Sequence, residues 1–89
     1  MAVLVTARVE NQTAEGFDNI FAGLAPAMRQ AKGFIAVGGG NSREGWQTFE
    51  IWESSEDATD FFSKYVRPNL PPSVKPHRSM LELHTLMLK

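Results

Sequence analysis

Apolar and polar side chains alternate along the first stretch of the chain, AVLVTARVE, from Ala2 to Glu10. This alternation is typical of a β-strand that is buried on one face. One face would carry the small or β-branched side chains Val3, Val5, Ala7 and Val9. The opposite face would carry Leu4, Thr6 and Arg8. We therefore expect the chain to begin with a strand.

A helical pattern follows from Thr13, a residue type that commonly caps a helix N-terminus. The apolar residues then recur at spacings of three and four, which places them on one helix face. They are Phe17, Ile20, Phe21, Leu24 and Met28. Pro26 removes a backbone donor and should kink or divide this helix, and Gly33 should end it.

Two further strands are predicted from GFIAVGG and GWQTFEIWE, with the glycine-rich stretch 38–45 in the hairpin loop between them. Gly40 and Gly45 have the spacing of a phosphate-binding loop. However, Trp46 and Gln47 stand where that motif needs Lys and Ser or Thr, and a strand follows in place of a helix. We expect this loop to bind no nucleotide and to be mobile at its tip.

The second helix should begin after Ser54, because Asp57 follows three positions later as in a capping box. Its apolar face would comprise Ala58, Phe61, Phe62, Tyr65 and Val66, and prolines from Pro68 onward would end it. The last strand is predicted from SMLELHTLMLK, residues 79–89. The order βαββαβ favours one domain over residues 1–89, an α+β ferredoxin-like sheet with both helices on one face.

The amino-acid composition excludes several classes of function. Among the 89 residues, basic and acidic side chains nearly balance, giving a net charge of -1, so we expect neither nucleic acid nor a membrane as a partner. The absence of cysteine excludes disulfides, thiolate chemistry and Cys-rich zinc sites. The N-terminal stretch lacks the pattern of a signal peptide, which favours a cytoplasmic protein. Several strands are apolar on both faces while two helices can cover only one, which predicts a homodimer.

The stretch GFIAV, followed by GWQTFEIWESSEDATDFF, resembles the antibiotic biosynthesis monooxygenase family of dimeric α+β barrels. The specific part of the resemblance runs from Gly33 to Phe62, and the order of elements extends it over nearly the whole chain. It implies a dimeric α+β barrel and a monooxygenase that needs no cofactor. Its substrate would be a small aromatic or polyketide-type compound, ionised in a dry pocket before it reduces oxygen itself. Two alternatives for this chain stay open: a non-oxidative cyclase or small-molecule-binding protein on the same scaffold, and a non-catalytic structural dimer.

The haem-degrading branch of this family has a further pattern, with Asn on the first strand, Trp in the second helix and a haem-binding His at its end. This chain differs at all three places. Thr6 or Ala7 stands at the Asn position and Phe61 at the Trp position, and VRPNLPP ends the helix without a histidine. The resemblance therefore does not extend to haem degradation.

An oxygenase of this kind needs a group that accepts a phenolic proton near neutral pH. His84 is our first candidate for this catalytic role, because histidine is the residue type best suited to proton transfer at neutral pH and the last predicted strand would hold its ring. Glu50, Glu82 and Tyr65 are the other candidates within predicted elements. If the face of His84 is the dimer face, however, its ring cannot reach a pocket beneath the helices.

Aromatic and cationic side chains are candidates for holding the substrate. Trp46 and Trp52 share one strand face with Thr48 and Glu50 between them, and either tryptophan could pack in a core or contact a ligand. The second helix and its surroundings add Phe61, Phe62, Tyr65, Arg67, His77 and Arg78. His77 is expected in a proline-flanked loop. Two histidines without a ligand spacing predict no metal site, and we expect no cofactor.

Overall fold

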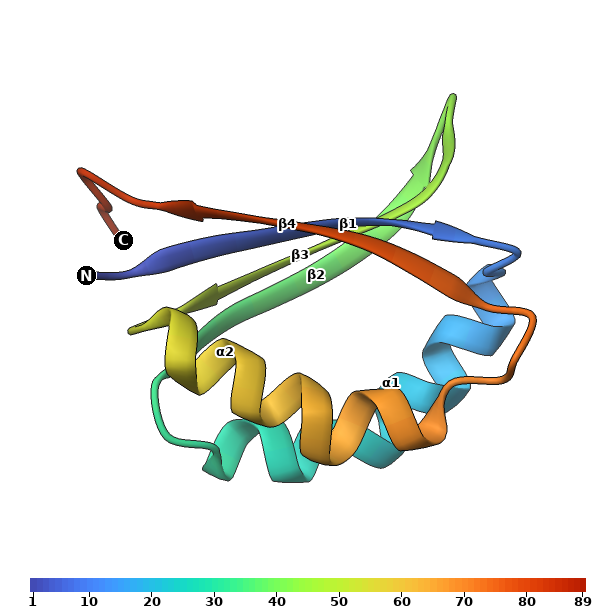
Figure 1. Cartoon of the computed structure of the whole chain (residues 1–89). Helices are drawn as coiled ribbons and strands as arrows, with labels where there is room; N and C mark the ends of the chain where they lie inside the picture. The colour runs from blue at the N-terminus through green and yellow to red at the C-terminus, as the bar shows by residue number, and fades with distance from the viewer.

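A computed structural model describes the whole chain, residues 1–89, as a twisted antiparallel sheet with its helices on one face (Figure 1). In chain order the elements are β1 (Val3–Glu10), α1 (Ala14–Gln30), β2 (Phe34–Ser42), β3 (Gly45–Trp52), α2 (Ser55–Phe61), η1 (Phe62–Val66), η2 (Arg67–Asn69) and β4 (Lys75–Glu82). The strand order is β2-β3-β1-β4, so β2 and β4 are the edges. The predicted ferredoxin-like βαββαβ arrangement is confirmed.

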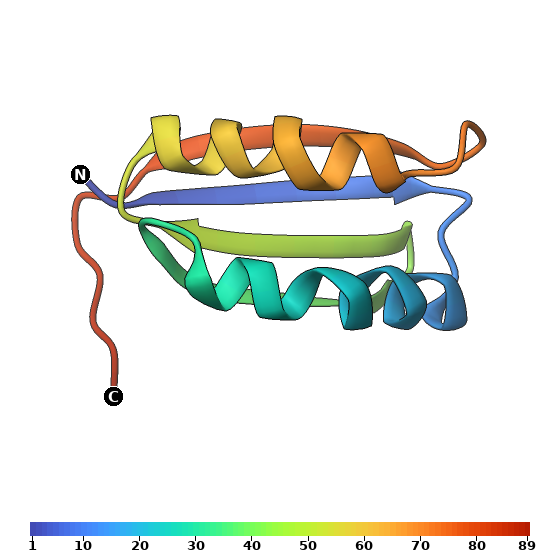
Figure 2. The same cartoon turned by 90° about the horizontal axis from the view of Figure 1, so that it is seen from below.

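The core lies between the sheet and the two helices, which run side by side across it (Figure 2). On β1 the buried side chains are Val3, Val5, Ala7 and Val9, the alternation predicted from the sequence. Trp52 is completely buried, with Phe34 and Phe61 packed on it at centroid distances of 5.5 and 5.4 Å. Aromatic contacts of this kind stabilise a small core beyond the area that they bury.

Both predicted helix starts are confirmed by their capping hydrogen bonds. The hydroxyl of Thr13 accepts the N–H of Gly16 at 3.0 Å, and the hydroxyl of Ser54 accepts the N–H of Asp57 at 3.1 Å. The prediction that Pro26 divides the first helix is wrong, because α1 continues through it. Pro26 and Ala22, whose carbonyl loses its partner, are both exposed, so water can replace the missing bond.

The glycine triplet does not form the hairpin loop, which corrects the sequence prediction. Residues 38–40 lie within β2 and pair with β3, and the turn consists of Arg43 and Glu44. A Cβ atom on Gly38 would overlap the ring of Phe49, and one on Gly39 would lie 3.2 Å from both Phe17 and Trp46. These glycines are therefore explained by the close approach of aromatic rings to the backbone.

The last strand lies earlier than predicted, at Lys75–Glu82, and His77 belongs to it rather than to a loop. Pro76 is tolerated because β4 is an edge strand, where a missing N–H breaks no ladder bond on the open side. The last residue of β4, Glu82, lies opposite Val3, and one further backbone bond joins the N–H of Leu83 to the carbonyl of Ala2. His84 follows this end, exposed, so its predicted place in the middle of a strand is wrong.

The second helix changes its winding after Phe61. The residues of η1 form a π-helical turn, in which the N–H of Arg67 donates to the carbonyl of Phe62, and a short 3₁₀ turn follows. Turns of this type are rare and occur frequently at functional sites. Neither helix has the length and hydrophobicity that a bilayer span requires.

Candidate functional site

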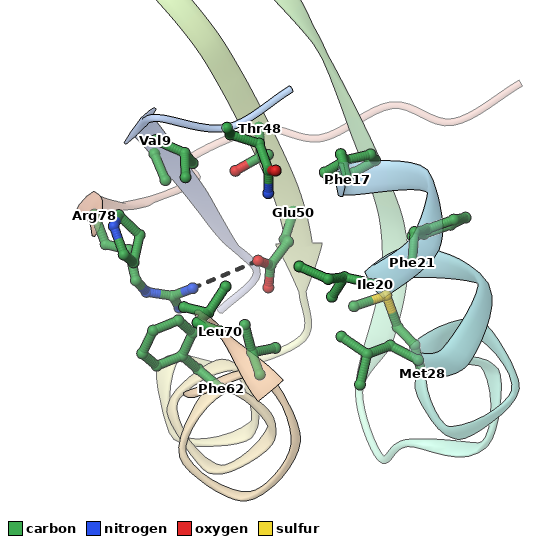
Figure 3. A pocket seen from close by; sticks show the side chains of 15 residues that line it. Val9, Phe17, Ile20, Phe21, Met28, Thr48, Glu50, Phe62, Leu70 and Arg78 are labelled. Atoms are coloured by element: carbon green, nitrogen blue, oxygen red, sulfur yellow. Dashed lines mark hydrogen bonds and ion pairs between the residues drawn. The ribbon is translucent and has the colours of Figure 1, made fainter. Parts of the chain in front are cut away.

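A cavity of about 90 Å³ lies between the helices and the sheet, with α1 on one side and η1 on the other (Figure 3). A single water needs roughly 10–15 Å³ on this measure, so the space exceeds a few waters. Its walls are mostly apolar: Ala7, Val9, Phe17, Ile20, Phe21, Leu24, Met28, Phe62, Val66, Leu70 and Pro76. Its polar side chains are Gln12, Thr48, Glu50 and Arg78.

Glu50 and Arg78 place opposite charges inside this apolar space. One carboxylate oxygen of Glu50, Oε1, accepts the indole N–H of Trp52 at 2.8 Å. The other, Oε2, lies 3.5 Å from Nη1 of Arg78, the contact drawn as a dashed line in Figure 3. The two side chains are only 13% and 20% exposed, so water screens this pair less than it screens a surface pair.

The sheet register explains why these two residues meet. Thr48, Ala7 and Arg78 form one row across β3, β1 and β4, and Glu50 lies in the next row, opposite Val5. The methyl side chain of Ala7 leaves room for Arg78 to extend over β1 toward Glu50. Three adjacent strands therefore hold the pair, with both residues on the face that the helices cover.

The guanidinium of Arg78 also lies 4.0 Å from the ring centroid of Phe62, a cation–π contact. Burial lowers the pKa of Arg78, the carboxylate of Glu50 raises it, and the nearby charge of Arg67 lowers it. Arg78 still carries its positive charge at neutral pH, since an arginine side chain titrates far above that range. Chemically, the cavity offers an oxygen that can accept a proton beside a fixed cation that can hold an anion.

The structure places the predicted aromatic residues in different surroundings. Phe62 lines the cavity directly, and Trp52 contributes indirectly by holding Glu50. Phe61 is buried in the core beside Trp52 and Tyr65, and Tyr65 is 44% exposed on the outside. Trp46 packs behind Phe17 at 5.0 Å, and its buried indole N–H has no hydrogen-bond partner. Ligand contact by these residues stays a prediction.

The charged residues predicted for the site also lie in different places. Arg67 lies 5.4 Å from the ring centroid of Phe62 and does not line the cavity itself. His77 points to the opposite face of the sheet, where it pairs with Glu10. His84 lies beyond β4 and does not line the cavity. No strand holds the ring of His84 against the cavity, contrary to the reason for which His84 was the first candidate.

The sequence contained one signal for this site. Glu50 stands between Trp46 and Trp52 in the alternation of β3, so a charged residue occupies a position that faces the core. A charge at such a position is rare unless it is paired. Its partner could not be read from the sequence, because Arg78 was expected to lie before the last strand and not within it.

Comparisons with known proteins address the fold. No family model matches the chain, and no curated protein matches it. Solved structures do. SnoaB, a cofactor-independent oxygenase from Streptomyces nogalater, superposes in a mutant form with a TM-score of 0.70. The match covers 99% of this chain and 97% of SnoaB, at 10% identity.

The chain has the fold of the antibiotic biosynthesis monooxygenases. A candidate monooxygenase from Shewanella loihica has a TM-score of 0.68 at 15% identity, and the match covers 96% of each chain. MhuD, a haem-degrading protein from Mycobacterium tuberculosis, has a TM-score of 0.63 at 15% identity, with 98% of this chain and 99% of MhuD covered. At such low identity these similarities establish the fold, and the chemistry has to be argued from the cavity.

Proposed function

We propose that the chain is a cofactor-independent monooxygenase acting on a small aromatic compound that carries a phenolic hydroxyl group. The observation that supports this most directly is the pair of Glu50 and Arg78, which faces a mostly apolar cavity. An apolar pocket with a few converging polar groups is the usual form of a small-molecule site. The fold shared with SnoaB, a cofactor-independent oxygenase, agrees with this assignment.

In the proposed reaction the carboxylate of Glu50 accepts the proton of the phenolic hydroxyl group. The guanidinium of Arg78 stabilises the negative charge on the resulting phenolate oxygen. The ionised ring is electron-rich and donates its own electrons to O₂. The ring carbon para to the phenolate oxygen, which bears one hydrogen, then takes one oxygen atom of O₂ and becomes a carbonyl group, while the phenolate C–O becomes the second carbonyl. The other oxygen atom leaves as water with the phenolic and ring hydrogens, so that no bound reductant is required. The apolar walls keep bulk water away from this intermediate.

Oxygen consumption with anthrone, whose tautomer anthrol carries the phenolic hydroxyl group, tests this proposal. We expect Glu50→Gln, which keeps the size and an acceptor for Trp52, to reduce turnover by roughly 10²-fold or more, the usual loss for a general base. Glu44→Gln in the exposed hairpin turn is the matched control and should retain full activity. No oxygen uptake by the unmodified protein, or equal rates for both variants, would refute the proposal. Conversion of anthrone under nitrogen would instead favour a non-oxidative enzyme.

We also propose that the chain forms a homodimer through the open face of its sheet. The register places Leu4 between Ile51 and Leu81, with Phe49 one row away. Phe49 is 42% and Leu81 59% exposed, so this apolar patch is uncovered in a single chain. Exposed apolar patches that continue across several strands are typical of interaction surfaces. A second copy would cover it with the same face, through a two-fold interface.

Sedimentation measures this directly. The unmodified protein should sediment as a dimer at micromolar concentration. Leu81→Glu should dissociate it, because the charge would have to be buried at the interface. Ser79→Glu, two residues earlier on the same face but beside polar neighbours, is the comparison and should weaken the dimer less. A stable monomer of the unmodified protein would overturn this proposal.

A further inference from the structure

An open groove adjoins the cavity on the side of η2 and β4. Phe62, Leu70, Pro76 and Arg78 line both spaces, so an elongated ligand could occupy the two together. The outer wall of the groove adds Arg67, Pro71, Pro72, Val74 and Lys75. The prolines fix their backbone φ angles, so this wall loses little freedom when a ligand binds.

Two guanidinium groups lie over one ring in this groove. Arg78 is 4.0 Å and Arg67 is 5.4 Å from the ring centroid of Phe62. They are close enough that the charge of Arg67 lowers the pKa of Arg78. Like charges held together in this way repel each other, and the repulsion is relieved when an anion lies between them.

The π-helical turn of η1 is what brings Arg67 to this position. Side chains three and four residues apart are neighbours on an α-helix, so a residue five positions after Phe62 would point elsewhere. In η1 the N–H of Arg67 donates to the carbonyl of Phe62, five residues back, and the wider turn returns Arg67 to the side of Phe62.

The hydrogen-bonding capacity of both arginines is largely unused. A guanidinium has five N–H donors, and Arg78 uses one of them, toward Glu50. The side chain of Arg67 makes no ion pair with the protein. Guanidinium donors match the oxygens of a carboxylate in geometry and charge.

The local charges indicate how many negative charges the ligand would bring. Glu50 balances one of the two guanidinium groups, which leaves one positive charge in the groove. Lys75 also lines the groove, but the sheet register sets it opposite Glu10, on the face away from the helices and from Arg78. A singly charged anion therefore complements the groove best.

We infer that the aromatic ligand carries a carboxylate group, which Arg67 and Arg78 bind in the groove above Phe62 while the ring occupies the cavity. This inference rests on the proposed function, because it assumes that the cavity takes an aromatic ring. It adds a requirement that the oxygenase chemistry itself does not impose. Arg67 touches the ligand at a point away from the reacting carbon and so determines which aromatic compounds bind.

A matched pair of probes tests the inference without any need for turnover. The probes are 4-hydroxyphenylacetate and its neutral amide, 4-hydroxyphenylacetamide, which share one ring and one hydroxyl group. Binding is followed by amide and indole N–H signals in two-dimensional NMR titrations, where the indole of Trp52 reports on Glu50 in the cavity. We expect the acid to bind about tenfold or more tightly than the amide, and high salt to reduce this difference.

Arg67→Gln should weaken binding of the acid about tenfold and change binding of the amide by less than about twofold. Arg43→Gln removes the same charge from the exposed hairpin turn and should change neither. Equal binding of acid and amide would refute the inference that the groove binds a carboxylate. The proposal that the cavity binds an aromatic ring would stand. A preference for the acid that survives in Arg67→Gln would overturn the role of Arg67. Binding of neither probe would overturn both the cavity's ligand class and the groove.

Discussion

The two tryptophans of β3 provide a paired test of how the core holds Glu50. Trp46 and Trp52 lie on the same face of one strand and are 6% and 0% exposed. Their indole N–H groups differ. That of Trp52 donates to Glu50 at 2.8 Å, whereas that of Trp46 is buried without a partner. Replacing each by Phe removes the same atoms from two similarly packed places.

The difference between the two variants isolates the hydrogen bond. Both lose part of a buried ring, so the packing cost is similar and largely cancels. Trp52→Phe also leaves Oε1 of Glu50 without a donor, and an unsatisfied buried acceptor costs about 1–3 kcal/mol. Trp46→Phe removes a donor that had no acceptor, which costs nothing in hydrogen bonding. Since Glu50 is 13% exposed and water can reach it in part, we expect Trp52→Phe to be less stable by about 1–2 kcal/mol.

Urea denaturation followed by circular dichroism, at one fixed protein concentration, measures both free energies of unfolding. For a domain of this size the expected difference corresponds to roughly 4–8 °C in melting temperature per kcal/mol. Each variant keeps one tryptophan, so fluorescence gives an independent transition. Equal destabilisation of the two variants, or a greater loss in Trp46→Phe, would show that the bond between Trp52 and Glu50 contributes nothing to stability.

Three further predictions concern the helix cap, an edge ion pair and the glycine triplet. Thr13→Ala should destabilise the protein by about 1 kcal/mol in thermal melts, because the hydroxyl accepts the N–H of Gly16; an unchanged melt would contradict this. The hydrogen bond from His77 lowers the pKa of Glu10 below its ordinary value of 4.5. The pair therefore stabilises the fold fully above pH 4.5, and this contribution disappears as the pH falls through the lowered pKa. Melting temperature should therefore fall less steeply with acid in Glu10→Gln, and parallel profiles would refute the assignment. Gly38→Ala should destabilise through overlap with the ring of Phe49, and a double-mutant cycle with Phe49→Ala should show relief rather than additive losses.

Much of the fold could be predicted from side-chain alternation because one face of each central strand is buried. That period alone predicts which residues of β1 point inward, and it places Trp46 and Trp52 on the same face of β3. The end of the edge strand β4 could not be predicted in this way. The apolar sequence after Glu82 has the composition of a continuing strand, yet its pairing with the first strand ends at the bond from the N–H of Leu83 to the carbonyl of Ala2. Strand ends depend on the length of the neighbouring strand, which local sequence does not contain.

The candidate site could be predicted only in part, for a related reason. The inward position of Glu50 follows from the alternation of β3, and Phe62 belongs to the apolar face of the second helix. The meeting of Glu50 with Arg78 depends on the register of two strand pairs, both formed with β1. The position of Arg67 beside Phe62 depends on a π-helical turn, and no periodicity in the sequence predicts such a turn.

The bare backbone at Gly39 sets the width of the cavity from outside it. Phe17 lines the cavity, and its ring rests directly on Gly39, where an added Cβ would lie 3.2 Å from the ring. A methyl group at this position would press the ring of Phe17 away from β2. A substitution at Gly39, an edge-strand residue outside the cavity lining, would therefore change the shape of the cavity without adding an atom to its walls.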